Sequence, residues 1–157
     1  MKAASLKELK EELKTLHPSK MLDLCMHLVK YKKENKELLS YLLFEVGDEQ
    51  SYIKEIKIQI EEEFENVNKS NLYLAKKTIR KILRITNKYI KYSGVKQTEV
   101  VLLIHFCKKI KESNLSLKAN SVLGNLYQRQ VIRIEKALAT LHEDLQYDYA
   151  EEIMLLK

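Results

Sequence analysis

Four side chains of the kinds that bind zinc occur in two closely spaced pairs. One residue separates Cys25 from His27, and one residue separates His105 from Cys107. Two cysteines and two histidines would complete a tetrahedral zinc site. Both pairs lie in segments with helical periodicity, where side chains two residues apart point about 200° away from each other. We therefore expect these residues to pack in a reduced core, with no metal and no cofactor.

A second candidate set lies near the C-terminus, where acidic side chains follow a histidine. Its members are His142, Glu143, Asp144, Asp148, Glu151 and Glu152. Di-iron and di-manganese bundles need Glu-x-x-His motifs on facing helices, and the chain contains no such motif. Walker and Rossmann glycine-rich loops are absent as well. We interpret the set as a solvated or salt-bridged helix face and expect the protein not to be an enzyme.

A row of cations forms the third and strongest candidate, in a segment from residue 70 to 94 that has no acidic side chain. Its members are Lys76, Lys77, Arg80, Lys81, Arg84, Lys88 and Lys91. At helical spacing they lie opposite an apolar face, which comprises Leu72, Ala75, Ile79, Ile82, Leu83, Thr86 and Ile90. Such a row can follow a phosphate backbone. Two other readings stay open: a solvated face, or pairing with the acidic stretches 61–65 and 143–152, within one chain or across a homodimer.

The charge distribution places the basicity in the middle of the chain. The net charge is +6, but residues 70–118 alone carry ten lysines and two arginines against two acids. The flanking regions, 1–69 and 119–157, are each slightly acidic. The positive charge therefore belongs to a folded segment and not to a tail.

Amphipathic helices are the elements that must position these residues. Hydrophobic residues make up 45% of the chain, and three glycines and one proline leave little sequence for long loops. We predict one all-α domain, residues 1–157, of six to eight helices arranged as a helical bundle or a short α-solenoid-like array. A weak similarity between segments 21–44 and 82–106 would favour the array, because helical hairpins are its repeating unit; chance similarity of two helix pairs is the alternative.

Capping residues predict several helix ends. Ser5 and Glu8 form a capping box at the first helix, and Pro18 can begin the second. Ser70 can cap the basic helix, which Gly94 can end in the left-handed conformation. In segment 37–46 the apolar run L-L-S-Y-L-L-F predicts burial on most sides.

Three later segments need a choice between competing patterns. Segment 49–67 alternates like a strand in part, but its isoleucines also keep helical spacing, and we predict a helix. Segment 98–112 is predicted to be a helix with Thr98 as its N-cap. From residue 120 to 156 apolar side chains recur every three or four positions. This pattern predicts one long C-terminal helix, with a kink near His142 as an option, whose apolar stripe from Leu123 to Tyr149 is buried.

The N-terminal sequence resembles a known group of proteins. The stretches L-K-E-L-K-E-E-L-K-T-L-H-P-S-K-M-L-D-L-C and Y-K-K-E-N-K-E-L-L-S-Y-L-L occupy residues 6–25 and 31–43. They resemble an uncharacterised group of small all-helical bacterial proteins that have a leucine-rich first helix. The resemblance implies a helical fold and a bacterial source, and it carries no activity because the group has none assigned.

These patterns lead to one expected function and one alternative. We expect a non-enzymatic binding or scaffold module that contacts a protein partner or forms a homo-oligomer. The alternative is sequence-nonspecific nucleic-acid binding through the basic row, Lys76 to Lys91. The longest apolar run, residues 100–107, is far shorter than the ~20 residues of a membrane span. No secretory signal pattern is visible at the start, so we expect a cytoplasmic protein that does not enter the membrane.

Overall fold

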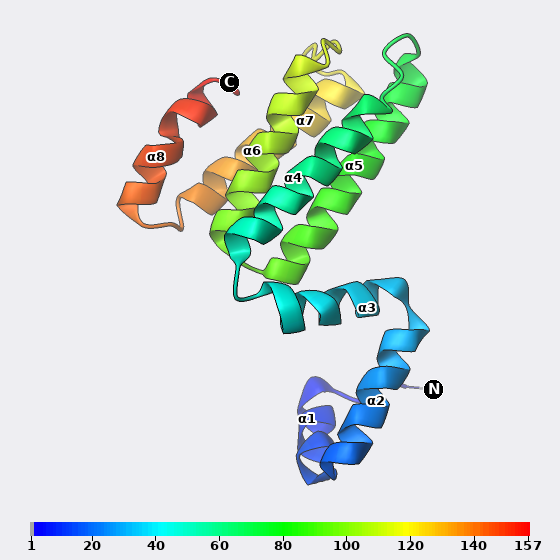
Figure 1. Ribbon diagram of the computed structural model, residues 1–157. Helices are drawn as coiled ribbons and strands as arrows, with labels where there is room; N and C mark the ends of the chain where they lie inside the picture. Colours follow the sequence, from blue (N-terminus) through cyan, green and yellow to red (C-terminus); the bar gives the residue numbers. More distant parts are fainter. Residues whose placement is uncertain (1) are drawn as a thin grey trace. The chain divides into compact units, whose positions relative to one another are not determined.

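Eight α-helices and one π-helical turn form the regular structure of residues 2–157, the part of the chain that the computed structural model describes (Figure 1). No strand occurs in this part, so the all-α prediction is confirmed, and the number of helices falls in the predicted range. The chain divides into two compact units, the first ending at Phe44 and the second beginning at Glu45.

The N-terminal unit contains three short helices: α1 (Leu6–Thr15), α2 (Pro18–Tyr31) and α3 (Lys33–Ser40). The predicted capping box is confirmed, because the Ser5 hydroxyl accepts from the Glu8 amide and the Glu8 carboxylate accepts from the Ser5 amide. Pro18 begins α2 as predicted. The side chain of Asn35 donates to the Leu28 carbonyl at 2.7 Å and so joins α3 to α2.

The predicted burial of segment 37–46 on most sides is wrong. The π-helical turn Tyr41–Glu45 follows α3, and Leu42, Leu43 and Phe44 within it are all exposed, Phe44 to 77%. The run has apolar side chains on all sides of the helical turn. The side that does not pack against other residues therefore exposes apolar groups. Helices α1, α2 and α3 themselves contain no buried residue.

The C-terminal unit is a bundle in which α4 (Glu49–Glu65), α5 (Leu72–Ser93), α6 (Lys96–Glu112) and α7 (Val122–Leu138) run side by side, followed by α8 (Glu143–Met154) (Figure 1). Helix α6 contacts α4, α5 and α7 and carries much of the core. Its fully or almost fully buried residues include Val100, Leu102, Leu103, Ile104, Phe106, Cys107 and Ile110. A helix covered on several sides needs apolar residues nearly all round, which is why this run also resembles a buried strand.

Helix α5 has the predicted amphipathic arrangement. Ala75, Ile79 and Ile82 are completely buried, which turns the opposite face outward. Gly94 ends the helix at φ 67°, as predicted, and its amide donates to the Ile90 carbonyl. The N-cap is Asn71 and not Ser70, because the Asn71 side chain accepts from the amides of both Tyr73 and Leu74.

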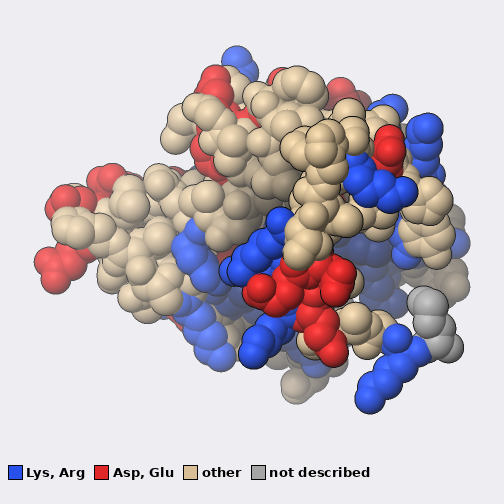
Figure 2. All heavy atoms as spheres, turned by 90° about the horizontal axis from the view of Figure 1, so that it is seen from below, with Lys and Arg blue, Asp and Glu red and all other residues tan. Residues whose placement is uncertain are grey.

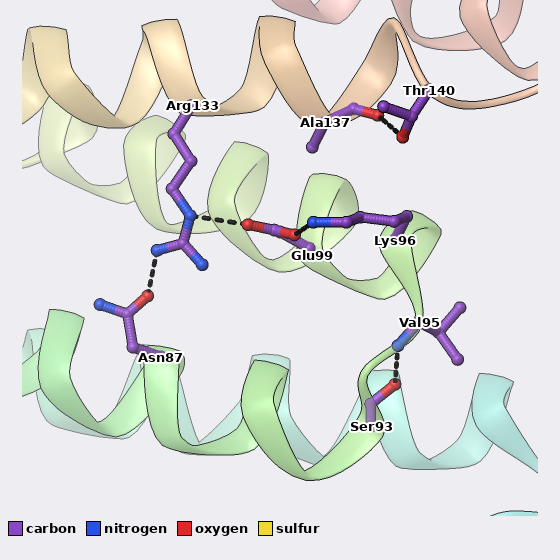
Figure 3. A network of polar contacts seen from close by, with 8 residues as sticks. All are labelled: Asn87, Ser93, Val95, Lys96, Glu99, Arg133, Ala137 and Thr140. Carbon is purple, nitrogen blue, oxygen red and sulfur yellow. Dashed lines mark hydrogen bonds and ion pairs between the residues drawn. The ribbon is translucent and has the colours of Figure 1, made fainter.

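The predicted N-cap of α6 is also wrong. The helix begins two residues before Thr98, with Val95 in the N-cap position. The Ser93 hydroxyl accepts from the Val95 amide (Figure 3). The Thr98 hydroxyl donates instead to the Glu49 carboxylate at the start of α4. The Thr98 hydroxyl therefore makes a tertiary hydrogen bond in place of the predicted capping hydrogen bond.

The C-terminal segment is two helices and not one long helix. Helix α7 ends at Leu138, and the Thr140 hydroxyl donates to the Ala137 carbonyl in the turn that follows (Figure 3). His142 then caps α8 by accepting from the Asp144 amide. The break turns α8 back against the bundle, where the Tyr127 hydroxyl donates to the Leu156 carbonyl.

Burial along the predicted C-terminal stripe changes at this break. On α7 the stripe residues Leu123, Tyr127, Val131 and Ile134 are buried as predicted, whereas those from Leu138 to Tyr149 are only half-buried.

A polar network ties α5, α6 and α7 together (Figure 3). Arg133 on α7 donates through Nε to the Glu99 carboxylate at 2.7 Å and through Nη1 to the Asn87 side chain on α5. Lys96 donates to the other Glu99 oxygen at 2.8 Å. Burial alone would raise the pKa of Glu99, but the hydrogen bonds and charges of Lys96 and Arg133 hold that pKa below its usual value.

Replacing Arg133 by methionine should therefore destabilise the fold by about 1–2 kcal/mol at neutral pH, because a buried carboxylate loses one of its two cationic partners. The Arg133 side chain is 37% exposed, which keeps the effect below that of a fully buried pair. The lowered pKa of Glu99 stabilises the fold above the unfolded-state pKa of about 4.3, and this stabilisation is lost as the pH falls through the folded-state pKa.

Urea unfolding near neutral pH and near pH 3 tests this prediction, and the loss should shrink at the lower pH. Arg129→Met, an exposed arginine on the same helix, is the matched control and should change little. An equal loss at both pH values would show that Arg133 acts through packing of its apolar stem and not through charge.

Candidate functional site

The basic row lies on the outward face of α5, as its position opposite the buried isoleucines requires. Five of its members are exposed, namely Lys77, Arg80, Lys81, Arg84 and Lys91, and Lys76 and Lys88 are half-buried. The helix is 22 residues long. Because the row extends over most of that length, its charges form a strip rather than a single point.

Most of this strip is not neutralised by acids. Lys81 pairs with Glu63 of α4 at 2.8 Å. The Lys88 ammonium lies over the Tyr89 ring, 4.6 Å from its centroid. The remaining five cations have no acidic partner among the residues that the structure describes; they are Lys76, Lys77, Arg80, Arg84 and Lys91.

The acidic stretches that could have covered the strip mostly pair elsewhere. Glu61 lies 3.3 Å from the Lys109 ammonium, and Glu152 pairs with Lys108, so both of these acids face α6. Among the described acids of these two stretches, Glu63 is the one that pairs with a cation of α5. Within the described part of the chain, internal pairing therefore leaves five cations of the row without an acidic partner.

An open hollow of about 640 Å³ lies against the N-terminal half of the strip. It is lined by Tyr73, Lys76, Lys77, Thr78, Arg80, Lys81 and Arg84. Tyr73 is 75% exposed and places an aromatic ring beside the cations. A positively charged hollow with an exposed aromatic ring suits phosphate groups and stacked bases.

The cysteine and histidine pairs are not brought together. Cys25 and His27 lie exposed on α2 in the N-terminal unit, so their predicted packing in the core is wrong. Cys107 on α6 is buried as predicted, and His105 on the same helix is partly buried. Burial raises the pKa of Cys107 to about 12, so its thiol stays protonated at neutral pH. Within residues 2–157 no three His, Cys, Asp or Glu side chains are grouped so that they could hold a metal ion.

His105 is partly buried on α6 with charged side chains nearby. Burial lowers its pKa, and the positive charges of Lys57 and Lys109 add to this effect, while Glu61 opposes it. The Nε2 atom is buried 3.3 Å from the Glu61 carboxylate but makes no hydrogen bond in the described structure. The lowered pKa favours the neutral form of the His105 imidazole.

The acids of the set near the C-terminus lie on α8, and they differ in exposure and in ion pairing. Glu143, Asp144, Asp148 and Glu151 are exposed, and Glu152 forms the ion pair with Lys108. Figure 2 shows acidic side chains projecting from α8, at the left of the view. His142 lies 3.2 Å from the Asp144 carboxylate at the start of the same helix. The set is thus a largely solvated face that also contains close charge pairs, so both of the arrangements that the sequence suggested are present.

Two recesses were not predicted, because each draws its lining from more than one helix. A polar recess of about 220 Å³ lies between α4, α6 and α8, where Lys57, His105 and Tyr149 are among its lining residues. An apolar groove of about 310 Å³ lies between α2 and α3, where Leu28 and Leu38 line it. Spacing along one helix carries no signal for such sites.

Comparison of the chain with protein families, with curated proteins and with solved structures gives no match. In residues 2–157 no helix has both the length and the apolar character needed to cross a membrane.

Proposed function

We propose that the protein is a non-catalytic binding module that holds nucleic acid by its phosphate backbone along the outer face of α5. The observation that carries this proposal is the strip of five cations without acidic partners on one face of a single helix. Contacts of this kind go to phosphate oxygens and not to base edges, so the binding is nearly independent of sequence.

The spacing of the strip supports contact with a chain of phosphates. Lys76, Arg80 and Arg84 are four residues apart, which corresponds to steps of about 6 Å along the helix axis. Two of these three are arginines, whose planar guanidinium groups bind phosphate oxygens in pairs. An extended polyanion can thus contact successive turns of α5 at once.

The energetics of the free helix also support a polyanionic partner. Like charges four residues apart destabilise a helix by about 0.2–0.5 kcal/mol per pair. Lys76–Arg80 and Arg80–Arg84 are two such pairs. The strip therefore costs helix stability in the unbound protein, and a row of phosphates would offset that cost.

Binding of fluorescently labelled duplex DNA, measured by anisotropy at two salt concentrations, tests the proposal. Five phosphate contacts predict a slope of about −4.5 for log K against log salt, or a loss of roughly five hundredfold between 50 and 200 mM. The triple variant Lys77→Gln, Arg80→Gln, Arg84→Gln should reduce the magnitude of that slope by about 2.7. Its fold should be intact, because all three side chains are exposed.

The matched control is Lys10→Gln, Lys20→Gln, Lys30→Gln, which removes the same charge from exposed lysines of the N-terminal unit. It should keep the wild-type slope. Absence of binding at 50 mM, or equal weakening in the two triple variants, would contradict the proposal, since the second result would show that only net charge matters. Duplex RNA tested in parallel should bind similarly.

A further inference from the structure

Helix α8 presents an exposed outward face in the C-terminal unit. Three large apolar side chains on it are strongly exposed: Tyr147 to 84%, Met154 to 75% and Leu155 to 66%. The same face carries the exposed acids Glu143, Asp144, Asp148 and Glu151. At 100° per residue these seven positions fall within an arc of roughly 140°, so they form one continuous surface. Acids interspersed with exposed aromatic and aliphatic groups are typical of a surface that binds a cationic partner.

The C-terminal end of α8 and the residues that follow it are attached to the bundle, which orients this outer face. The Lys111 ammonium donates to the Leu155 carbonyl at 2.7 Å. Lys157 pairs with Glu135 of α7 at 2.8 Å. Ile153 and Leu156 are buried. The outer face is therefore a preorganised surface and not a mobile tail.

The acidic face of α8 and the basic face of α5 are separated within one molecule. Figure 1 shows α8 at one side of the C-terminal unit and α5 at the other, with α4 and α6 between them. The ion pairs that the C-terminal segment makes go to α6 and α7, through Lys108 and Glu135. Neither charged face neutralises the other in the same chain.

We propose that the outer face of α8 docks on the outer face of α5 in a second copy of the chain. Charge complementarity carries this inference, because four exposed acids would meet five cations that have no acidic partner. Apolar groups are present on both surfaces: Tyr147 and Met154 on α8, and Tyr73 and Leu74 on α5. The contact joins two different patches, so it is heterologous and leaves a free α8 face and a free α5 face at the ends of each pair.

This contact uses the α5 surface that the proposed function assigns to nucleic acid. A second copy and a nucleic acid therefore compete for the same cations, and self-association covers the α5 face of one copy in each pair. The inference rests on the same basic strip as the proposed function, but it does not require that nucleic acid binds.

Sedimentation velocity of the full chain without nucleic acid tests the contact. Association should weaken by about tenfold or more between roughly 50 and 500 mM salt. The added salt shortens the Debye length and so screens the attraction between exposed charges on the two copies. The variant Asp144→Asn, Asp148→Asn, Glu151→Gln should weaken it by at least about tenfold at low salt. The control Glu55→Gln, Glu62→Gln, Glu65→Gln neutralises three exposed acids of α4 and should leave association unchanged.

Mixing two impaired variants makes the test specific for the α5–α8 contact. The α8 variant keeps its α5 face, and the variant Lys77→Gln, Arg80→Gln, Arg84→Gln keeps its α8 face. Each should be monomeric alone, whereas an equimolar mixture should form heterodimers through the two intact faces. A monomeric wild type at low salt, an α8 variant that associates normally, or a mixture that stays monomeric would each overturn the inference.

The two proposals fail in distinguishable ways. The α8 variant retains the basic strip, so it should bind duplex DNA at least as tightly as the wild type does. Self-association without DNA binding would leave the contact between copies standing and remove the nucleic-acid proposal. DNA binding by a chain that stays monomeric would do the reverse.

Discussion

Replacing Phe106 by alanine should lower the free energy of unfolding by about 3–5 kcal/mol. The Phe106 side chain is completely buried on α6. Its ring centroid lies 5.8 Å from that of Phe64 on α4. Alanine would remove the apolar transfer energy and leave a cavity that the surrounding helices cannot fully close. Urea unfolding followed by helical circular dichroism measures the loss.

Phe44→Ala is the matched control for this substitution. The same side chain is removed there from a position that is 77% exposed, so the expected change is within about 0.5 kcal/mol. Similar losses at the two positions would show that Phe44 is also buried in solution, and a small loss for both would contradict the central place of α6 in the core.

Gly124→Ala should destabilise the protein by about 3 kcal/mol, although intrinsic helix propensity favours alanine by about 1 kcal/mol. Gly124 lies in the first turn of α7, where an added Cβ would be 2.3 Å from the Lys118 carbonyl oxygen and 3.0 Å from the Leu117 carbonyl oxygen. Both atoms belong to the backbone and cannot rotate away. The loop before α7 would have to move, together with the Ser121 cap that accepts from the Gly124 amide.

Gly47→Ala provides the contrast. No atom lies within 4 Å of a Cβ built there, so alanine should be neutral or stabilise by up to about 1 kcal/mol through the unfolded state. Thermal unfolding of the two variants side by side measures the difference. A stabilising effect of Gly124→Ala would mean that the 117–121 loop does not pack against the helix start in solution.

Competition at α5 links the two functional proposals to solution conditions. Both partners bind through exposed charges, so both contacts weaken with added salt. A nucleic acid presents many phosphates in a row, whereas α8 presents four exposed acids. At moderate salt the polyanion should therefore displace the second copy, and the oligomer should dissociate as DNA is added.

Local hydrogen bonds and helical periodicity depend on residues close together in the sequence. The features that follow from them could therefore be predicted from the sequence alone. The capping box at Ser5 needs only residues within one turn. Gly94 can adopt φ 67° at the end of α5 whatever surrounds it, because it has no Cβ. The burial of Ile79 and Ile82, and hence the outward direction of the cations, follows from their spacing.

Features that depend on which helices meet were decided by tertiary structure alone. Thr98 suits an N-cap by type, but the Glu49 carboxylate from another helix takes its hydroxyl. The apolar pattern from residue 120 onward continues through the break before α8, since periodicity reports which face is apolar and not whether the axis is straight. The apolar run that ends at Phe44 predicts burial, but the packing of the folded chain leaves both Leu42 and Leu43 exposed.

The candidate site divides along the same line. Residue types and spacing determined that seven cations share one face of α5, because one helix holds them all. Whether acids cover that face depends on how α4, which carries Glu61 and Glu63, and α8, which carries Glu152, pack in the bundle. These two helices lie far apart in the sequence. Packing placed Glu61 and Glu152 against α6 and only Glu63 against α5. A charge on a helix is a local property, but its neutralisation depends on the distance to other helices, which only the folded chain determines.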